Sequence, residues 1–399
     1  NSGRSAADGG IDMTYAGELE IHDADSHVVE TPEMLRDFAD PAIRDRLDRL
    51  EFYRVLGGHG RPDDFPVYRS NHADPLYRAR DEAELMLRKN WHATGSFLKE
   101  DRPRALDMLG FKTQLVFNTF WNAYLLRLEH SGDLDLAYGA ARAHNRSMLD
   151  FCSADRRLLA SCYVPLADFE LASAMAGEAL RAGAKVLLVP SACPRGHSPS
   201  HVGLDAVWRQ AEEAGIPIVM HVGGHGPFNR DYFENGLPPV KDFHGGAENF
   251  RSIDYMGIPV APAQTLATLI IDGVMERFPR LMFGVIEQGA TWVPGLMRQL
   301  DSALEAFGRH EDRLRRLSLK PSEYIRRQVR ATPYPSEDVG WVIEQAGEEV
   351  CLFSSDYPHV EGGRHPIKRF ESNLMNISKR GKDRFYHDNF VDLMGAGLN

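Results

Sequence analysis

The chain has 399 residues, of which 43% are hydrophobic and 26% charged, as in an ordinary soluble globular protein. Its formal net charge of −11 argues against a nucleic-acid-binding surface, and no apolar run approaches the roughly 20 residues that a membrane-spanning helix needs. The four cysteines form no CxxC pair, which predicts reduced, mostly buried thiols in a cytoplasmic protein. Residues 1–12 are small and polar, so we expect a disordered tail or tag remnant before a single domain over residues 13–399.

Short apolar segments recur along the chain, and several are nearly continuous in Val, Leu and Ile, as is typical of parallel strands covered on both faces. In order they are Leu19–Ile21, Thr113–Phe117, Leu158–Val164, Lys185–Val189, Ile216–Met220, Leu281–Ile286, Gln328–Ala331 and Val350–Phe353. Amphipathic segments such as Asp168–Ala182 and Asp205–Ala214 separate them. The alternation predicts an α/β fold, a (β/α)8 TIM barrel, with a doubly wound sheet as the alternative.

Two connections are much longer than the others. They cover about residues 28–107, after the first strand, and residues 223–262, after the fifth. Both follow the carboxyl end of a strand, where a TIM barrel keeps its active site. We therefore predict that these two segments form a lid.

Candidate metal ligands gather at the predicted strand ends. Asp25 and His27 are two residues apart on the first strand, so their side chains face the same side. A single His or Asp after a strand is commonly a structural residue or a helix cap, but the convergence of several at one barrel mouth favours a metal site. The candidates are, in chain order, Asp25, His27, His221, His244, Glu287, Asp356, His359 and Glu361.

Five motifs carry a family resemblance. "DADSHVVETPEM", "MHVGG", "IEQGATWVP", "SSDYPHVEG" and the ending "FYHDNFVDLMG" resemble the amidohydrolase superfamily, and within it the aminocarboxymuconate-semialdehyde decarboxylase group. That group has a His-x-His pair on the first strand, a His on the fifth and an Asp on the eighth. The resemblance implies that Asp25, His27, His221 and Asp356 hold a metal ion, with Asp25 in place of the first His.

The sequence departs from this pattern at the sixth strand, where Glu287 stands in place of a catalytic His. Up to four carboxylates and three imidazoles are then available, which is more than one zinc ion needs and suits two iron ions. This pattern resembles an oxygen-activating branch, the nonheme diiron monooxygenases of platensimycin and platencin biosynthesis. The resemblance implies a second iron held by Glu287 and His359, with Glu361 or His244 completing its ligands.

The resemblance implies hydroxylation of an unactivated carbon in an apolar, diterpenoid-type acyl substrate linked to coenzyme A. Such a reaction uses O2 and an external electron donor, with Asp356 and Glu287 as the catalytic residues. Barrels of this branch often pair, which leaves a homodimer open. The alternative is a single Zn or Mn ion that activates water, with Asp356 as general base, for hydrolysis or non-oxidative decarboxylation. A third interpretation is a barrel without activity that serves as a binding scaffold.

Overall fold

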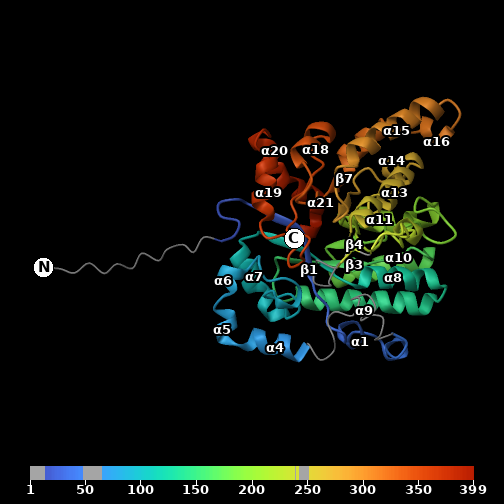
Figure 1. The fold of residues 1–399 in the computed structure, drawn as a ribbon. Helices are drawn as coiled ribbons and strands as arrows, with labels where there is room; N and C mark the ends of the chain where they lie inside the picture. Colours follow the sequence, from blue (N-terminus) through green and yellow to red (C-terminus); the bar gives the residue numbers. More distant parts are fainter. Residues whose placement is uncertain (1–13, 48–64, 239, 242–250) are drawn as a thin grey trace.

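The computed structural model describes residues 14–47, 65–238, 240–241 and 251–399. Its sheet has seven parallel strands that neighbour one another in chain order. Figure 1 shows the chain coloured along its sequence. The strands are β1 (His22–Val28), β2 (Thr113–Asn118), β3 (Leu158–Tyr163), β4 (Val186–Leu188), β5 (Ile218–His221), β6 (Phe283–Ile286) and β7 (Val329–Ala331). This sequential order confirms the predicted α/β barrel and excludes the doubly wound sheet, in which the strand order reverses.

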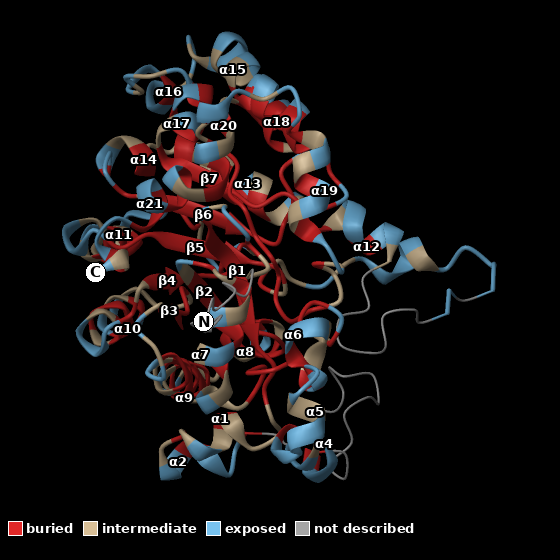
Figure 2. Ribbon diagram, turned by 90° about the vertical axis from the view of Figure 1, so that its left-hand side faces the viewer, coloured by how far each residue is buried: buried red, intermediate tan, exposed pale blue. Residues whose placement is uncertain are grey.

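Helices surround the sheet, and Figure 2 shows the buried strands in the middle of the molecule with exposed helix faces outside them. After β2 the longer helices are α8 (Trp121–Ser131), α9 (Leu134–Cys152), α10 (Phe169–Ala182), α11 (Asp205–Ala214), α13 (Val260–Ile271), α15 (Val293–Phe307), α17 (Pro321–Gln328), α18 (Val339–Ala346), α19 (Pro366–Asn373) and α21 (Asn389–Met394). Shorter helices are α12 (Ser252–Gly257), α14 (Val274–Arg277), α16 (Asp312–Arg315) and α20 (Lys379–Asp383). Local signals set their ends. Asp168 caps α10 by accepting a hydrogen bond from the Leu171 amide, and Gly183 ends it with a left-handed backbone at φ 99°.

The predicted eighth strand is not a regular strand in the structure. Residues 350–357 nevertheless close the barrel, because Cys351 bridges to Ala331 of β7 and Tyr357 bridges to Ser26 of β1, both in parallel. Regular pairing fails near Ser355, whose amide donates to the Asp23 carboxylate at 2.8 Å instead of to a neighbouring strand. We call residues 350–357 the closing segment.

The predicted position of the first strand is wrong. Leu19–Ile21 precedes β1, which begins at His22 and continues to Val28 with every residue buried. A buried strand with this many polar residues is stable because neighbouring side chains form hydrogen bonds with its polar atoms. Asp23 accepts hydrogen bonds from Gln114 Nε2 at 2.9 Å and from the Ser355 hydroxyl at 2.6 Å.

The two long connections contain short helices and closely packed turns. The first holds α1 (Met34–Asp37), α2 (Pro41–Arg44), α4 (Phe65–Ala73), α5 (Pro75–Arg78), α6 (Asp81–Glu84) and α7 (Arg102–Leu109). Its residues near 90 pack on the barrel mouth, where Trp91 Nε1 donates to the Glu30 carbonyl and Tyr357 donates to the Thr94 carbonyl. That part of the first connection is a fixed wall of the mouth. The lid role of both segments stays a prediction, and residues 48–64, 239 and 242–250 lie outside the described residues.

Candidate metal centre

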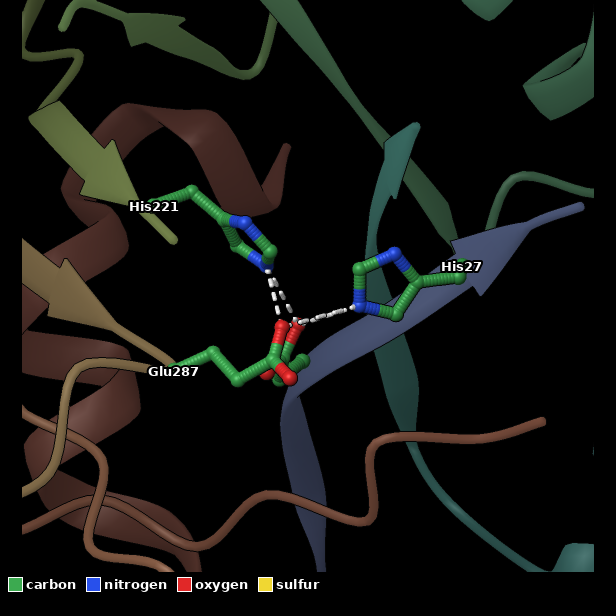
Figure 3. A group of neighbouring side chains, drawn as sticks. His27, His221 and Glu287 are labelled. Atoms are coloured by element: carbon green, nitrogen blue, oxygen red, sulfur yellow. Dashed lines mark hydrogen bonds and ion pairs between the residues drawn. The ribbon is translucent and has the colours of Figure 1, made fainter. Parts of the chain in front are cut away.

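Acidic and imidazole side chains from four places in the chain meet at the barrel mouth. Figure 3 shows His27 of β1, His221 of β5 and Glu287, directly after β6, pointing toward one another. His221 Nε2 lies 3.2 Å from both Asp25 Oδ1 and Glu287 Oε2. His27 Nε2 lies 3.2 Å from Asp25 Oδ1, 3.3 Å from Asp356 Oδ1 and 3.6 Å from Glu287 Oε2.

The potential ligand atoms form two adjoining groups that share His27 and Glu287. The first group adds Asp25 and His221, and the second adds Asp356 and His359. Within each group the ligand atoms lie within 4.8 Å of one another, and every residue is buried. We call them the first and second ligand groups.

Backbone geometry places two of the carboxylates. Glu287 and Asp356 have φ values of 53° and 52°, in the left-handed region that non-glycine residues rarely adopt. Such a conformation costs about 1–3 kcal/mol and persists where the surroundings enforce it. At Glu287 two backbone hydrogen bonds enforce this conformation. The amide donates to Thr332 Oγ1 at 2.7 Å, and the carbonyl accepts from the Tyr334 hydroxyl at 2.6 Å.

Hydrogen bonds on the outer side of the histidines determine which nitrogen faces the site. His27 Nδ1 lies 2.9 Å from the Asn118 carbonyl, which accepts only, so Nδ1 donates there and Nε2 is the nitrogen that faces the site. The nearest acceptor of His221 Nδ1 is the Val222 carbonyl at 3.0 Å, which leaves its Nε2 facing the carboxylates. Histidines that ligate metals are oriented in this way.

Electrostatics also favour a cation in the site. Burial alone would lower the pKa of His27, but Asp25, Asp356 and Glu287 outweigh it and hold that pKa well above its ordinary value. Burial would likewise raise the pKa of Asp356, yet His359 and His27 hold it below its ordinary range. Asp25 Oδ2 and Asp356 Oδ2 are buried and accept no hydrogen bond from the described part of the chain. A divalent ion fits this set of donors, because buried carboxylates need positive charge.

Three residues next to these groups were not predicted from the sequence. Arg102 is fully buried; one guanidinium nitrogen donates to the His27 carbonyl at 2.8 Å and Nε donates to Gln114 Oε1 at 3.1 Å. Lys89 Nζ donates to the Gly363 carbonyl at 2.7 Å; burial lowers its pKa to about 8, against the attraction of Asp356 and Glu361. The burial of long cationic side chains, complete at Arg102 and partial at Lys89, is not visible in a sequence.

The third is Glu30. It accepts hydrogen bonds from the Thr119 and Phe120 amides, just before α8, a helix far along the chain. Of the eight predicted ligands, the structure gathers six into the two groups. Glu361 lies in neither group, and His244 lies outside the described residues.

A cavity of about 510 Å³ lies beside the site. The loops after β4 and β5 line it together with α12 and α13, and its apolar walls include Phe228, Phe233 and Val260. It adjoins the first ligand group through Ser191, whose hydroxyl accepts a hydrogen bond from Gln288, the residue after Glu287.

A family model described as amidohydrolase matches residues 23–389, which is most of the chain. The chain belongs to the amidohydrolase family. The matched region contains all eight predicted ligands. No curated protein matches the sequence.

Solved amidohydrolase-type structures share the fold. An amidohydrolase from Mycobacterium avium subsp. paratuberculosis K-10 is 22% identical, with a TM-score of 0.68, over 95% of this chain and 100% of that one. The 5-carboxyvanillate decarboxylase from Novosphingobium aromaticivorans, complexed with manganese and 4-hydroxy-3-methoxy-5-nitrobenzoic acid, is 18% identical, with a TM-score of 0.63, over 96% and 98%.

The dihydroxybenzoic acid decarboxylase from Polaromonas sp. JS666, with bound manganese and 2-nitroresorcinol, is 15% identical, with a TM-score of 0.57, over 94% and 96%. At these identities the likeness extends to the fold alone. The chain has three buried cysteines and one exposed, all free, as predicted. No helix in the described ranges is long and apolar enough to cross a bilayer.

Proposed function

We propose that this amidohydrolase-family protein is a metal-dependent monooxygenase that holds two iron ions and hydroxylates an apolar acyl substrate with O2. The observation that carries the proposal is the second ligand group. His359 reaches the site from beyond the closing segment, its Nδ1 lies 3.0 Å from Asp356 Oδ1, and its ring stacks on His27 with centroids 3.8 Å apart. A single ion in the first group would not use His359, whereas a second ion would take it as a ligand.

In this proposal the first ion uses Asp25, His27, His221 and Asp356, and the second uses Glu287 and His359. The structure supports a variant of this set, in which His27 and Glu287 belong to both ligand groups. Two ferrous ions held there would supply two electrons to O2, and O2 reduced in this way would oxidise a C–H bond of the substrate. Overall, the substrate, O2, two electrons and two protons yield the hydroxylated product and water, so an external electron donor is part of the proposal.

The chain's own residues would position the substrate and protect the reaction. All six side chains of the ligand groups are buried, so the reacting atoms meet little competing water. Asp356 Oδ2, which accepts no hydrogen bond from the described residues, can hold a proton during the reaction. The apolar cavity beside the first group supplies room for the body of an organic substrate. By the resemblance stated above, we propose a coenzyme A thioester of diterpenoid type.

A second candidate is a hydrolase or non-oxidative decarboxylase with one Mn or Zn ion. The comparisons favour this candidate, because several solved structures with the same fold are decarboxylases and some contain manganese. One ion in the first ligand group would activate a water molecule, and Asp356 would take its proton as general base. Glu287, which stands where the related decarboxylases are expected to have His, counts against the usual decarboxylation route.

Metal analysis of protein purified without added metal tests the proposal. We expect about two irons per chain, and O2 consumption with an acyl-coenzyme A substrate and a reductant. A single Mn or Zn ion, with release of CO2 or a hydrolysis product from an aromatic acid under anaerobic conditions, would overturn it in favour of the second candidate.

A further inference from the structure

We propose that Thr119 is a positioning residue that fixes the tautomer of His359 and thereby controls binding of the second metal ion. This inference rests on the proposed two-metal function. Thr119 lies between β2 and α8 and is buried. Its hydroxyl is 2.9 Å from His359 Nε2, the ring nitrogen that faces away from Asp356.

The direction of that hydrogen bond follows from a second contact. Thr119 Oγ1 is also 2.8 Å from the Val28 carbonyl, which accepts hydrogen bonds and cannot donate. The single hydroxyl proton therefore points to Val28, and Oγ1 accepts from His359 Nε2–H. Neutral imidazole carries one proton, so Nδ1 is left with a lone pair on the side of Asp356 Oδ1, where the second ligand group needs it.

Thr119 is held rigidly enough to impose this choice. Its amide donates to Glu30 Oε1 at 2.9 Å, and Glu30 is itself buried and bonded to the Phe120 amide. The hydroxyl is therefore fixed by β1 on one side and by the turn before α8 on the other. His359 is fully buried, so its Nε2–H is shielded from bulk water.

The hydrogen-bond acceptor at His359, the Thr119 hydroxyl, differs in kind from the acceptors at the other two histidines. His27 uses the Asn118 carbonyl and His221 uses the Val222 carbonyl, and a backbone acceptor survives any side-chain substitution. At His359 the acceptor is a side chain. One substitution can therefore remove tautomer control from the second ligand group and leave it intact in the first.

Replacing Thr119 by Val keeps the shape and removes the acceptor. His359 Nε2–H would then lose the Thr119 acceptor, whereas a proton on Nδ1 could be donated to Asp356. The imidazole is expected to change tautomer, and the nitrogen that faces the second ion loses its lone pair. Removing such an outer partner of a metal-binding histidine typically weakens metal affinity about 10–100-fold.

The test compares T119V and T119S with the wild-type chain and with H359A, which removes the ligand itself. Each protein is stripped of metal, titrated with Fe²⁺ or Co²⁺ without O2, and analysed for ions bound per chain and for the affinity of each. Electron paramagnetic resonance of the Mn²⁺-loaded proteins distinguishes a coupled ion pair from a single ion. Thermal unfolding of the metal-free proteins checks that the fold is retained.

We expect two ions in the wild type and in T119S, and one tightly bound ion in T119V and H359A with the second weakened about 10–100-fold. Two ions of wild-type affinity in T119V would overturn the role of Thr119 and leave the proposed function standing. One ion in the wild type would overturn the proposed function itself. If T119S behaves like T119V, the hydroxyl is not the controlling group and the inference fails.

Discussion

Glu287 occupies the position where the resemblance leads one to expect a catalytic histidine, and its carboxylate belongs to both ligand groups. We expect Glu287→Ala to lose one metal ion per chain and to abolish the proposed hydroxylation. The fold should be kept, because the surrounding hydrogen bonds to Glu287 involve its backbone. Metal analysis and circular dichroism check this. A variant that retains both ions would remove Glu287 from the ligand set.

Arg102 is a buried cation that joins β1 to β2 from behind the site. Besides the His27 carbonyl and Gln114, it donates to the Gly95 carbonyl at 3.2 Å. Arg102→Met keeps much of the side-chain volume and leaves these acceptors unsatisfied, so we expect the free energy of unfolding to fall by about 3 kcal/mol or more. Urea denaturation measures this. Arg298→Met, at an exposed position of α15, is the matched control and should change little.

Glu129 should make stability depend on pH. Burial raises its pKa from 4.5 to about 7, although hydrogen bonds from the Leu166 amide and the Tyr163 hydroxyl act in the opposite direction. Between these pH values the folded chain holds a proton that the unfolded chain has lost. The stability from this group is therefore complete below about pH 4.5 and is lost as pH rises through 7, by about 3 kcal/mol at 1.36 kcal/mol per pKa unit.

Denaturation curves from pH 4 to 8 test this expectation. The Glu129→Gln side chain has no proton to lose. Its free energy of unfolding should therefore fall by about 3 kcal/mol less than that of the wild type as the pH rises from 4.5 to 7. Glu305→Gln, an exposed replacement on α15, should keep the wild-type slope. Equal slopes in wild type and Glu129→Gln would show that Glu129 ionises at the same pH in both states.

At the scale of elements, apolar runs predicted β2 to β7 closely, since these strands bury Val, Leu and Ile on both faces. β1 was misplaced because its buried side chains are polar and are satisfied by partners such as Gln114 and Ser355, which are distant in sequence. The ligand candidates were predictable from residue type at strand ends. The role of Thr119 was not, because it depends on which atoms meet across β1, β2 and the turn at His359.

The turn after the closing segment is packed directly against it. A Cβ atom added at Gly362 would overlap the Ser355 carbonyl oxygen and lie 3.0 Å from Asp356 Cβ. We expect Gly362→Ala to displace Asp356, to weaken metal binding about 10-fold and to cost about 1–3 kcal/mol of stability.

Gly363→Ala is the neighbouring control. Gly363 has open space around its Cβ position but a φ of 72°, so alanine there should cost about 1 kcal/mol without affecting the ions. Calorimetric metal titration separates the two variants. Wild-type affinity in Gly362→Ala would show that the turn can move without displacing Asp356.

For the whole molecule, metal removal leaves three buried carboxylates around one point, Asp25, Glu287 and Asp356. A bound ion at 100 times its dissociation constant stabilises the folded chain by about 2.7 kcal/mol. We therefore expect chelation to lower the melting temperature by several degrees, and re-addition of Fe²⁺ or Mn²⁺ to restore it. Scanning calorimetry measures both steps. A melting temperature that chelation does not change would mean that no bound ion stabilises the folded chain.

The closing segment has a consequence for how the protein is made. The ring of strands joins β1, almost the first described part of the chain, to residues 350–357, close to its end. While a ribosome is still translating the middle of the message, Asp25 and His27 have emerged without Asp356 and His359, and β1 has one open edge. A metal ion can therefore find both ligand groups complete only after Asp356 and His359 have been synthesised, and until then the second edge of β1 has no partner from the closing segment.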